Sequence, residues 1–224
     1  MHIEPGVVDG AKMVLATGTA AAAAGYGAKL MWDDLRARGV ASLTTRAALA
    51  TVGTFVFFEV LPHVPVGVSE VHFILGTTLF LILGAAPAAF GLAMGLLIQG
   101  VLFAPTDLPM YFVNLTTLLV PLFAVTAMAQ RLMPAQKAYV DMSYGDVLKL
   151  SALYQGGVIA WVAFWVIYGQ GAGVETMTAL GAFALAYCTV IVVEPVVDLL
   201  VLAGAKTLNA RGAVWSSDRL YRGA

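Results

Sequence analysis

The chain has 224 residues, of which 60% are hydrophobic and 11% are charged, and its formal net charge is −1. A soluble domain averages about 45–50% apolar and about 25% charged residues, so this composition excludes an ordinary soluble protein and indicates an integral membrane protein. The absence of a basic run from the sequence argues against a nucleic-acid partner. Backbone groups in lipid must be paired internally, and the apolar segments do not alternate with polar residues. We therefore predict an all-α membrane protein with a single domain, residues 1–224.

The first apolar segment covers residues 7–32. One interpretation is a signal peptide that is cleaved at the alanine tract of this segment. However, Glu4 and Asp9 precede the segment with only Lys12 as a basic residue, which is the wrong sign for a signal peptide. We therefore predict a retained helix whose amino end lies outside the cell.

Further apolar runs cover residues 44–62, 72–86, 88–103, 110–131, 147–169 and 174–203. At about 20 residues per span, the chain is expected to form a bundle of about seven transmembrane helices. With the amino terminus outside, the outer side holds only Lys12. The inner side holds all other basic residues, which are Lys29, Arg36, Arg38, Arg46, Arg131, Lys137, Lys149, Lys206, Arg211, Arg219 and Arg222. This asymmetry predicts a cytoplasmic carboxyl terminus with a short tail from about residue 205 to residue 224.

The histidines of the chain, His2, His63 and His72, all fall on the predicted outer side, together with Asn114. The terminal amine of Met1, the amide nitrogen of His2 and a ring nitrogen of His2 can face one ion. Such a nitrogen set suits the square-planar geometry that Ni(II) and Cu(II) prefer and that Co(II) accepts. A lone histidine is more often a hydrogen-bonded loop residue. Histidines at one membrane level beside an amino-terminal chelate predict a shared metal site.

The loop between the second and third runs contains Pro65 and Gly67, which favour a tight turn. Ser69 and Glu70 follow this turn and are candidates to orient a ligand ring, because a coordinating histidine normally donates its other nitrogen to an oxygen. The alternative for both is a solvated turn.

Three places in the sequence resemble the CbiM/NikM permease family, the substrate-capture components of cobalt/nickel energy-coupling-factor (ECF) ABC transporters. They are the opening Met1-His2-Ile3, the loop from Pro65 to His72, and the segment from Asp107 to Asn114. The resemblance covers most of the chain. It implies that the amino terminus folds into the bundle mouth. The implied metal ligands are the amine of Met1, the amide and ring of His2, and the ring of His72. The resemblance assigns Asn114 to supporting the inserted terminus.

The sequence also departs from the family pattern. Glu4-Pro5-Gly6 replaces Met-Glu-Gly after the opening, and Thr117 stands where a second asparagine is expected. The loop carries Glu70 among valines in place of glycine and serine or threonine. These departures bear on the surroundings of the metal more than on its ligands. His63 matches no ligand of the family, and we interpret it as a loop residue, with a transient ligand for incoming ions as the alternative.

Acidic residues within the apolar runs are costly and therefore candidates for function. Glu59 lies near the outer end of the second run, where it could attract cations or simply meet water. Glu194 and Asp198 lie one turn apart in the last run. We interpret this pair mainly as carboxylates that reach water at the inner interface, with the lining of a release path or a contact with a partner as the alternative.

Together these features predict a capture subunit for Co²⁺ or Ni²⁺, without an organic cofactor, in an ATP-driven ECF transporter of the bacterial inner (plasma) membrane. The sequence has no phosphate-binding Gly-x-x-x-x-Gly-Lys-Ser/Thr loop, so it is not expected to be an enzyme, and ATP hydrolysis falls to separate chains. The resemblance implies an ATPase pair, a transmembrane coupling (T) subunit and a small accessory membrane subunit as partners. We expect the small residues of the first two spans to make the contact. One alternative is a capture subunit of the same architecture for a vitamin. Another is an intramembrane metalloenzyme, although the sequence lacks a His-Glu-x-x-His motif.

Overall fold

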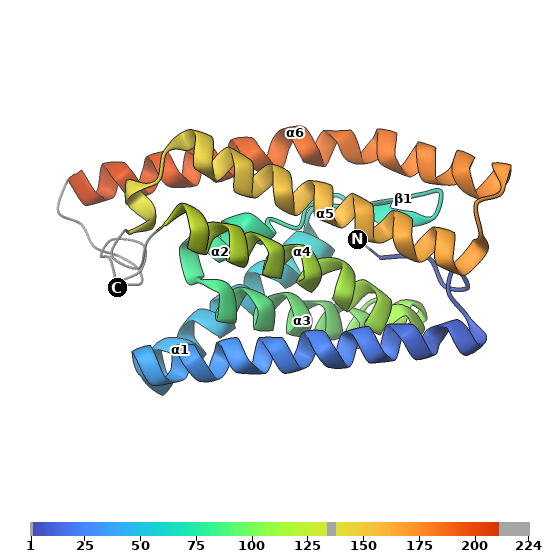
Figure 1. Cartoon of the computed structure of the whole chain (residues 1–224), viewed down its shortest axis with the longest axis horizontal. Helices are drawn as coiled ribbons and strands as arrows, with labels where there is room; N and C mark the ends of the chain where they lie inside the picture. The colour runs from blue at the N-terminus through green and yellow to red at the C-terminus, as the bar shows by residue number, and fades with distance from the viewer. Residues whose placement is uncertain (1, 134–137, 211–224) are drawn as a thin grey trace.

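The computed structural model describes residues 2–133 and 138–210, and these are predominantly helical (Figure 1). The elements in chain order are a 3₁₀ turn Gly10–Lys12, α1 Met13–Phe55, a π-helical turn Val56–Val60, β1 Val64–Val66, β2 Ser69–Val71, α2 Gly76–Leu83, α3 Ala85–Leu102, a 3₁₀ helix Pro105–Met110, α4 Tyr111–Leu132, a 3₁₀ turn Tyr139–Asp141, α5 Tyr144–Gln170 and α6 Val174–Ala210.

Within the described residues, five helical segments are long and apolar enough to cross a membrane. They are Gly10–Val60, Ala85–Leu102, Pro105–Leu132, Tyr144–Gln170 and Val174–Ala210. This set agrees with the prediction of an all-α, multi-pass membrane protein. The part of the predicted carboxyl tail beyond residue 210 lies outside the described residues.

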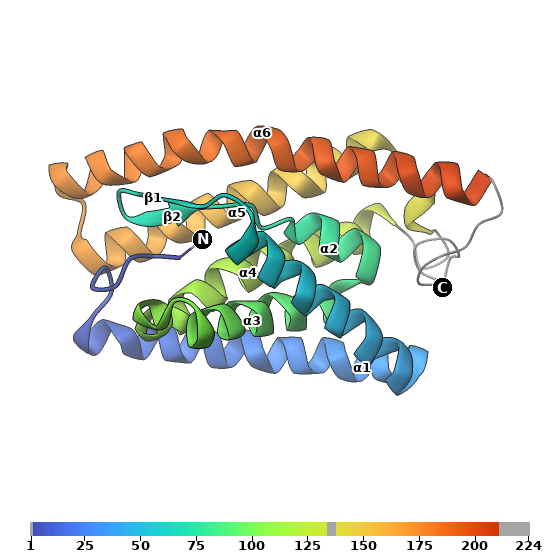
Figure 2. The ribbon, with the colours of Figure 1, turned by 180° about the vertical axis from the view of Figure 1, so that it is seen from behind.

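Helix α1 contains most of each of the first two predicted spans, and the second span continues into the π-helical turn Val56–Val60. Gly39 has a positive φ of 79° inside this helix, a conformation that glycine adopts without steric cost. The chain therefore reverses within α1, and its second half runs back across the molecule (Figure 2). Arg46 secures the reversal, because its buried guanidinium pairs with Asp34 and donates a hydrogen bond of 2.7 Å to Leu83 O at the end of α2.

The predicted third span, residues 72–86, is not one continuous helix. Residues 72–75 are non-helical, Leu75 has a positive φ of 52°, and α2 has 8 residues. At 1.5 Å per residue α2 is about 12 Å long, which is too short to cross a membrane alone. Gly84, with a φ of 94°, separates α2 from α3, close to the boundary expected between the runs over residues 72–86 and 88–103.

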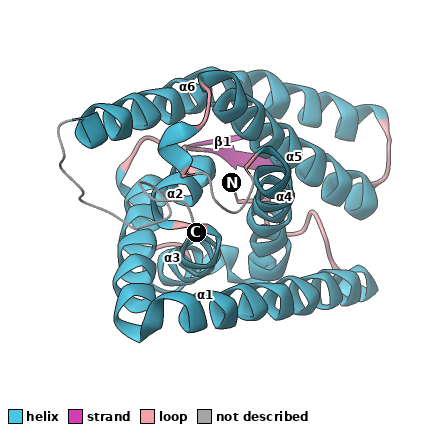
Figure 3. Cartoon of the chain, turned by 60° about the vertical axis from the view of Figure 1, so that its left-hand side comes forward, coloured by secondary structure: helices cyan, strands magenta, loops and turns pink. Residues whose placement is uncertain are grey.

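The two short strands form an antiparallel hairpin in which Val64 pairs with Val71 and Val66 with Ser69. Gly67 makes the turn with a φ of 63°, and a side chain there would collide with the backbone oxygen of Ala179 on α6. The hairpin tip is thus packed against α6. Figure 3 shows the hairpin and the amino-terminal segment surrounded by helices. Long helices therefore enclose a small irregular region, in which the amino-terminal segment meets the hairpin.

Candidate metal centre

The amino-terminal segment lies antiparallel to β2 through an isolated bridge. Glu70 N donates to His2 O at 2.9 Å, and Ile3 forms an antiparallel bridge with Ser69. The Ser69 hydroxyl also donates to His2 O, at 3.0 Å. On the other side of the segment, Ile3 N donates to Asn114 Oδ1 of α4 at 2.8 Å. These bonds fix the backbone of His2 inside the protein.

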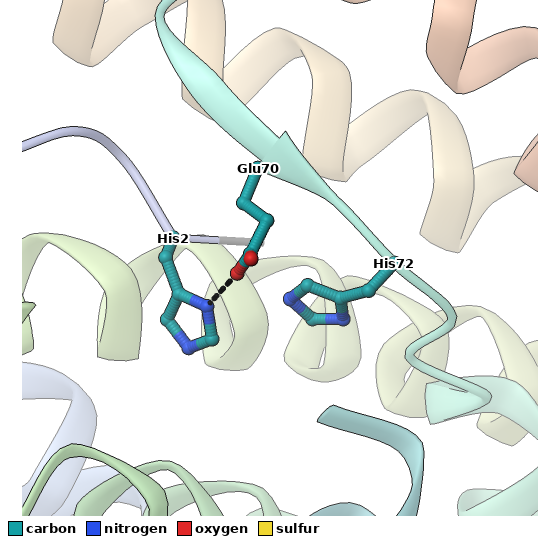
Figure 4. Close-up of side chains that lie close together, drawn as sticks. All are labelled: His2, Glu70 and His72. Atoms are coloured by element: carbon teal, nitrogen blue, oxygen red, sulfur yellow. Dashed lines mark hydrogen bonds and ion pairs between the residues drawn. The ribbon is translucent and has the colours of Figure 1, made fainter. Parts of the chain in front are cut away.

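Three potential metal ligands lie close together at the start of this segment. One ligand atom from each of His2, Glu70 and His72 lies within 4.8 Å of the others. His2 Nδ1 is 2.7 Å from Glu70 Oε2, and the two imidazole ring centroids are 5.0 Å apart (Figure 4). The histidines are 3% and 2% exposed. We call these three residues the His–Glu–His cluster.

The orientation of His72 is set by its own backbone. His72 Nδ1 lies 2.9 Å from Phe73 O, and because a carbonyl oxygen only accepts, Nδ1 must carry the proton in this bond. The lone pair is then on Nε2. In Figure 4 the other nitrogen of His72 faces Glu70 and His2. Phe58 closes the apolar side of the cluster, with its ring centroid 4.5 Å from that of His72 and 5.7 Å from that of His2.

The electrostatic environment favours a neutral imidazole beside a carboxylate. Burial lowers the pKa of His2 below its ordinary value, an effect that the hydrogen bond with Glu70 partly offsets. Burial alone would raise the pKa of Glu70, but the hydrogen bond and charge of His2 outweigh it, so the pKa of Glu70 is lowered. A neutral imidazole and a carboxylate are the forms that coordinate divalent ions. The cluster therefore offers imidazole nitrogen and carboxylate oxygen to one small cation.

The structure brings several of the predicted residues to this cluster. Glu70 bonds Nδ1 of His2, whereas Ser69 bonds the backbone of His2 and not a ligand ring. Asn114 contacts the inserted segment, as expected from the resemblance. Met1 lies outside the described residues.

Other predicted residues lie apart from the cluster. The Thr117 hydroxyl donates to Val113 O within α4, 2.9 Å away. His63 is exposed at the rim, where its Nδ1 contacts Leu61 O at 3.2 Å and its Nε2 is 3.9 Å from Glu70 Oε1. Glu59 lies in the π-helical turn Val56–Val60, half-buried.

The inner acidic pair is buried in the bundle. Glu194 and Asp198 are each 1% exposed, so the interpretation in which they reach water is wrong. Glu194 accepts hydrogen bonds of 2.5 Å from Ile74 N and from Gln155 Nε2. Asp198 accepts one of 2.5 Å from the Thr78 hydroxyl. These carboxylates thus bind the start of α2, where non-helical backbone needs partners at membrane depth.

Sequence reasoning missed Gln99 and Gln155. Gln155 connects α5 to α6, because its Nε2 donates to Glu194 and its Oε1 accepts from the Tyr187 hydroxyl, each at 2.5 Å. Gln99 is buried in α3 and lines a small cavity beside His2. The available signal was a polar amide inside each of two apolar runs, which marks a position where a hydrogen bond is needed.

Comparisons with known proteins agree with this geometry. The family model CbiM, described as a cobalt uptake substrate-specific transmembrane region, matches residues 2–210. A solved structure of a transition metal transporter superposes with a TM-score of 0.70 at 18% identity, over 94% of each chain. A truncated transition metal transporter gives a TM-score of 0.64 at 16% identity, over 96% of this chain and 100% of that one. At these identities the two structures establish a shared fold. No curated protein sequence matches the chain.

Proposed function

Because the chain belongs to the CbiM family of cobalt-uptake transmembrane regions, we propose that it captures Co²⁺ or Ni²⁺ for an ATP-driven ECF importer. Membership of this family supports a multi-pass membrane protein for metal uptake and favours a transporter over a metalloenzyme. The single observation that carries the proposal is the buried His–Glu–His cluster, which convergent backbone bonds hold in place.

In this proposal the metal ion binds to His2 Nδ1 and His72 Nε2. The amine of Met1 and the amide nitrogen of His2 are the further donors, which gives the nitrogen-rich set that Ni(II) and Co(II) accept. Glu70 bonds Nδ1 before the ion arrives and yields that nitrogen to it. The carboxylate then remains beside the bound cation and partly balances its charge. Because the amine and the amide must lose protons to coordinate, binding weakens as the pH falls.

We place the cluster on the outer side of the bacterial inner membrane, following the distribution of basic residues. The partners are a transmembrane coupling subunit, an ATPase pair and a small accessory membrane subunit. An apolar groove of about 420 Å³ along α1, which Ala20, Ala24 and Phe112 help to line, supports a helix contact at the small-residue face. Selection between cobalt and nickel rests on geometry and supply, since the donor set suits both.

The decisive experiment compares the purified protein with its native amino terminus and the same protein with one residue added before Met1. Binding of Ni²⁺ and Co²⁺ is measured by competition with a chelating dye, and the matched control carries the same residue at the carboxyl end. We expect the amino-terminal addition to weaken binding about hundredfold or more, because it removes the amine from its position and disturbs the inserted strand. Equal affinity in all three proteins would refute the amino-terminal chelate.

The vitamin-capture alternative makes the opposite prediction for His72. If the histidines were incidental, His72→Ala would leave substrate capture unchanged. Metal uptake in cells that express the complete transporter therefore separates the two proposals. Loss of nickel or cobalt accumulation with His72→Ala supports metal capture, and unchanged accumulation contradicts it.

A further inference from the structure

A small cavity lies beside the His–Glu–His cluster. His2, Gln99, Asp107 and Asn114 supply its polar lining, and Tyr111 and Leu108 lie among the other residues around it. Gly100 allows Leu108 to close over this space, since a Cβ on Gly100 would lie 2.9 Å from Leu108 Cδ2. The cavity therefore sits directly against a proposed metal ligand.

Three buried polar atoms on the residues around this cavity have no hydrogen-bond partner among residues 2–133 and 138–210. They are His2 Nε2, Gln99 Oε1 and Asn114 Nδ2. All three residues are more than nine-tenths buried. Buried polar groups are normally satisfied by protein or by an ordered water molecule, and leaving them unpaired is costly. That three such atoms belong to residues lining one cavity points to a shared partner.

The chemistry of these atoms suits one water molecule. Asn114 Oδ1 accepts from Ile3 N, so its Nδ2 is the donor that remains. Gln99 Oε1 is an acceptor, and His2 Nε2 accepts or donates according to its tautomer. The cavity offers about 10 Å³ to the centre of a water-sized sphere, enough for one molecule. Water donates two bonds and accepts two, so it can serve all three atoms.

We propose that a single ordered water molecule occupies this cavity and fixes the imidazole of His2 through Nε2. The inference rests on the proposed function, because the ring that it holds is the proposed metal ligand. In Figure 4 the Nδ1 atom of His2 faces Glu70, and the other ring nitrogen points away from both Glu70 and His72. Glu70 and the water thus hold opposite edges of one ring. Removing the water's anchor would let the ring rotate away from the ion.

Gln99 is therefore a positioning residue that acts through the water, and Asn114 has two tasks. Its oxygen holds the backbone of Ile3, and its amide nitrogen holds the water. Asp107 is half-buried and lines the same cavity. The ring of His2 finds a partner in either tautomer, because water both donates and accepts.

The test compares Gln99→Met with Gln99→Glu in the full-length protein with its native terminus. Methionine keeps the length of the side chain but removes the acceptor, whereas glutamate keeps an oxygen at the same position. Nickel affinity is measured as above, with Gln130→Met, at an exposed glutamine near the other end of the bundle, as the matched control. We expect Gln99→Met to weaken binding about tenfold or more, and Gln99→Glu and the control to remain close to wild type.

Two results would overturn the inference. Unchanged affinity in Gln99→Met would show that the ring does not depend on this anchor. An equal loss in Gln99→Met and Gln99→Glu would show that Gln99 acts by packing alone.

A second measurement needs no cavity variant. In protein labelled with ¹⁵N at its histidines, we expect a nuclear Overhauser effect between the His2 imidazole protons and a long-lived water, with His63→Gln and His72→Gln used for assignment. Its absence overturns the water site. This readout is made without metal, so wild-type protein that binds no nickel or cobalt would overturn the proposed function separately.

Discussion

The His–Glu–His cluster and the Glu194–Asp198 pair are two groups of buried polar residues with different surroundings. In the acidic pair, Glu194 accepts bonds from Ile74 N and Gln155, and Asp198 Oδ1 accepts a bond from Thr78. In the cluster, His72 Nδ1 bonds Phe73 O, and His2 Nε2 belongs to a residue that lines the small cavity. The other nitrogen of each imidazole faces the space that they share with Glu70. Buried polar residues in a membrane protein can thus either support the backbone or offer ligand atoms to an ion. The direction of their polar atoms distinguishes these two roles.

The two regions are mechanically connected. Glu194 holds Ile74 N, two residues after His72, while Phe73 O fixes the ring of His72. The acidic pair therefore supports the irregular backbone that carries one metal ligand. A charge that costs energy at this depth is retained because the non-helical segment needs a strong acceptor.

The largest effect should come from His72 itself. His72→Ala removes a proposed donor atom, and since loss of outer-shell partners alone costs about 10–100-fold in affinity, we expect a loss of about hundredfold or more. Thermal unfolding of the apoprotein in detergent should change little, because the main-chain bonds of the hairpin remain. A metal affinity within about threefold of that of wild type would exclude His72 from the metal site.

Glu70→Gln should have the next largest effect. The substitution keeps the size of the side chain and removes the carboxylate that faces His2 Nδ1 at 2.7 Å. Without this charge the bound cation loses its nearest balancing group, and we expect nickel affinity to fall about tenfold. Competition with a chelating dye measures it. A rise in affinity would contradict the role given to Glu70 and would instead mean that the carboxylate competes with the ion for His2.

Glu194→Leu should affect stability more than binding. It removes the acceptor for Ile74 N and Gln155 Nε2 in the bundle interior, a loss of about 2 kcal/mol in the free energy of unfolding. Nickel affinity should fall only a few-fold, because the ligand atoms remain. Glu194→Gln, which keeps one acceptor oxygen, is the matched control and should retain most of the stability. Loss of binding without loss of stability would make Glu194 part of a metal path, contrary to the structural role.

The sequence allowed prediction of the membrane class and of the cluster, but not of the inner framework. Composition and apolar runs indicate helices, because lipid leaves few other solutions for the backbone. His2 and His72 could be joined through the family resemblance and the turn at Gly67. The mostly apolar composition of residues 72–86 predicts one helix, whereas the helix begins only at Gly76. Its break depends on Leu75 and on a carboxylate 120 residues away, a contact that local periodicity cannot reveal.

The position of Gln99 illustrates the same limit. A polar residue in an apolar run indicates that a partner exists, but the partner of Gln99 depends on how α3 and the amino-terminal strand meet. Thr117 shows the reverse case. Its place in the family pattern suggested a site residue, whereas its hydroxyl bonds within its own helix. Long-range packing decides both, and only the three-dimensional arrangement supplies it.

His63→Ala should have the smallest effect. The side chain is 38% exposed, its Nδ1 contacts Leu61 O, and its Nε2 lies 3.9 Å from Glu70 Oε1. A water-exposed ion pair of this length contributes little, so equilibrium affinity should remain within about twofold of wild type. If His63 passes ions to the cluster, the association rate measured by stopped-flow should fall while affinity stays the same. A loss of affinity comparable to that of His72→Ala would place His63 in the metal site. The cluster would then extend to the exposed rim. It would differ from the buried acidic pair in exposure to water as well as in the direction of its polar atoms.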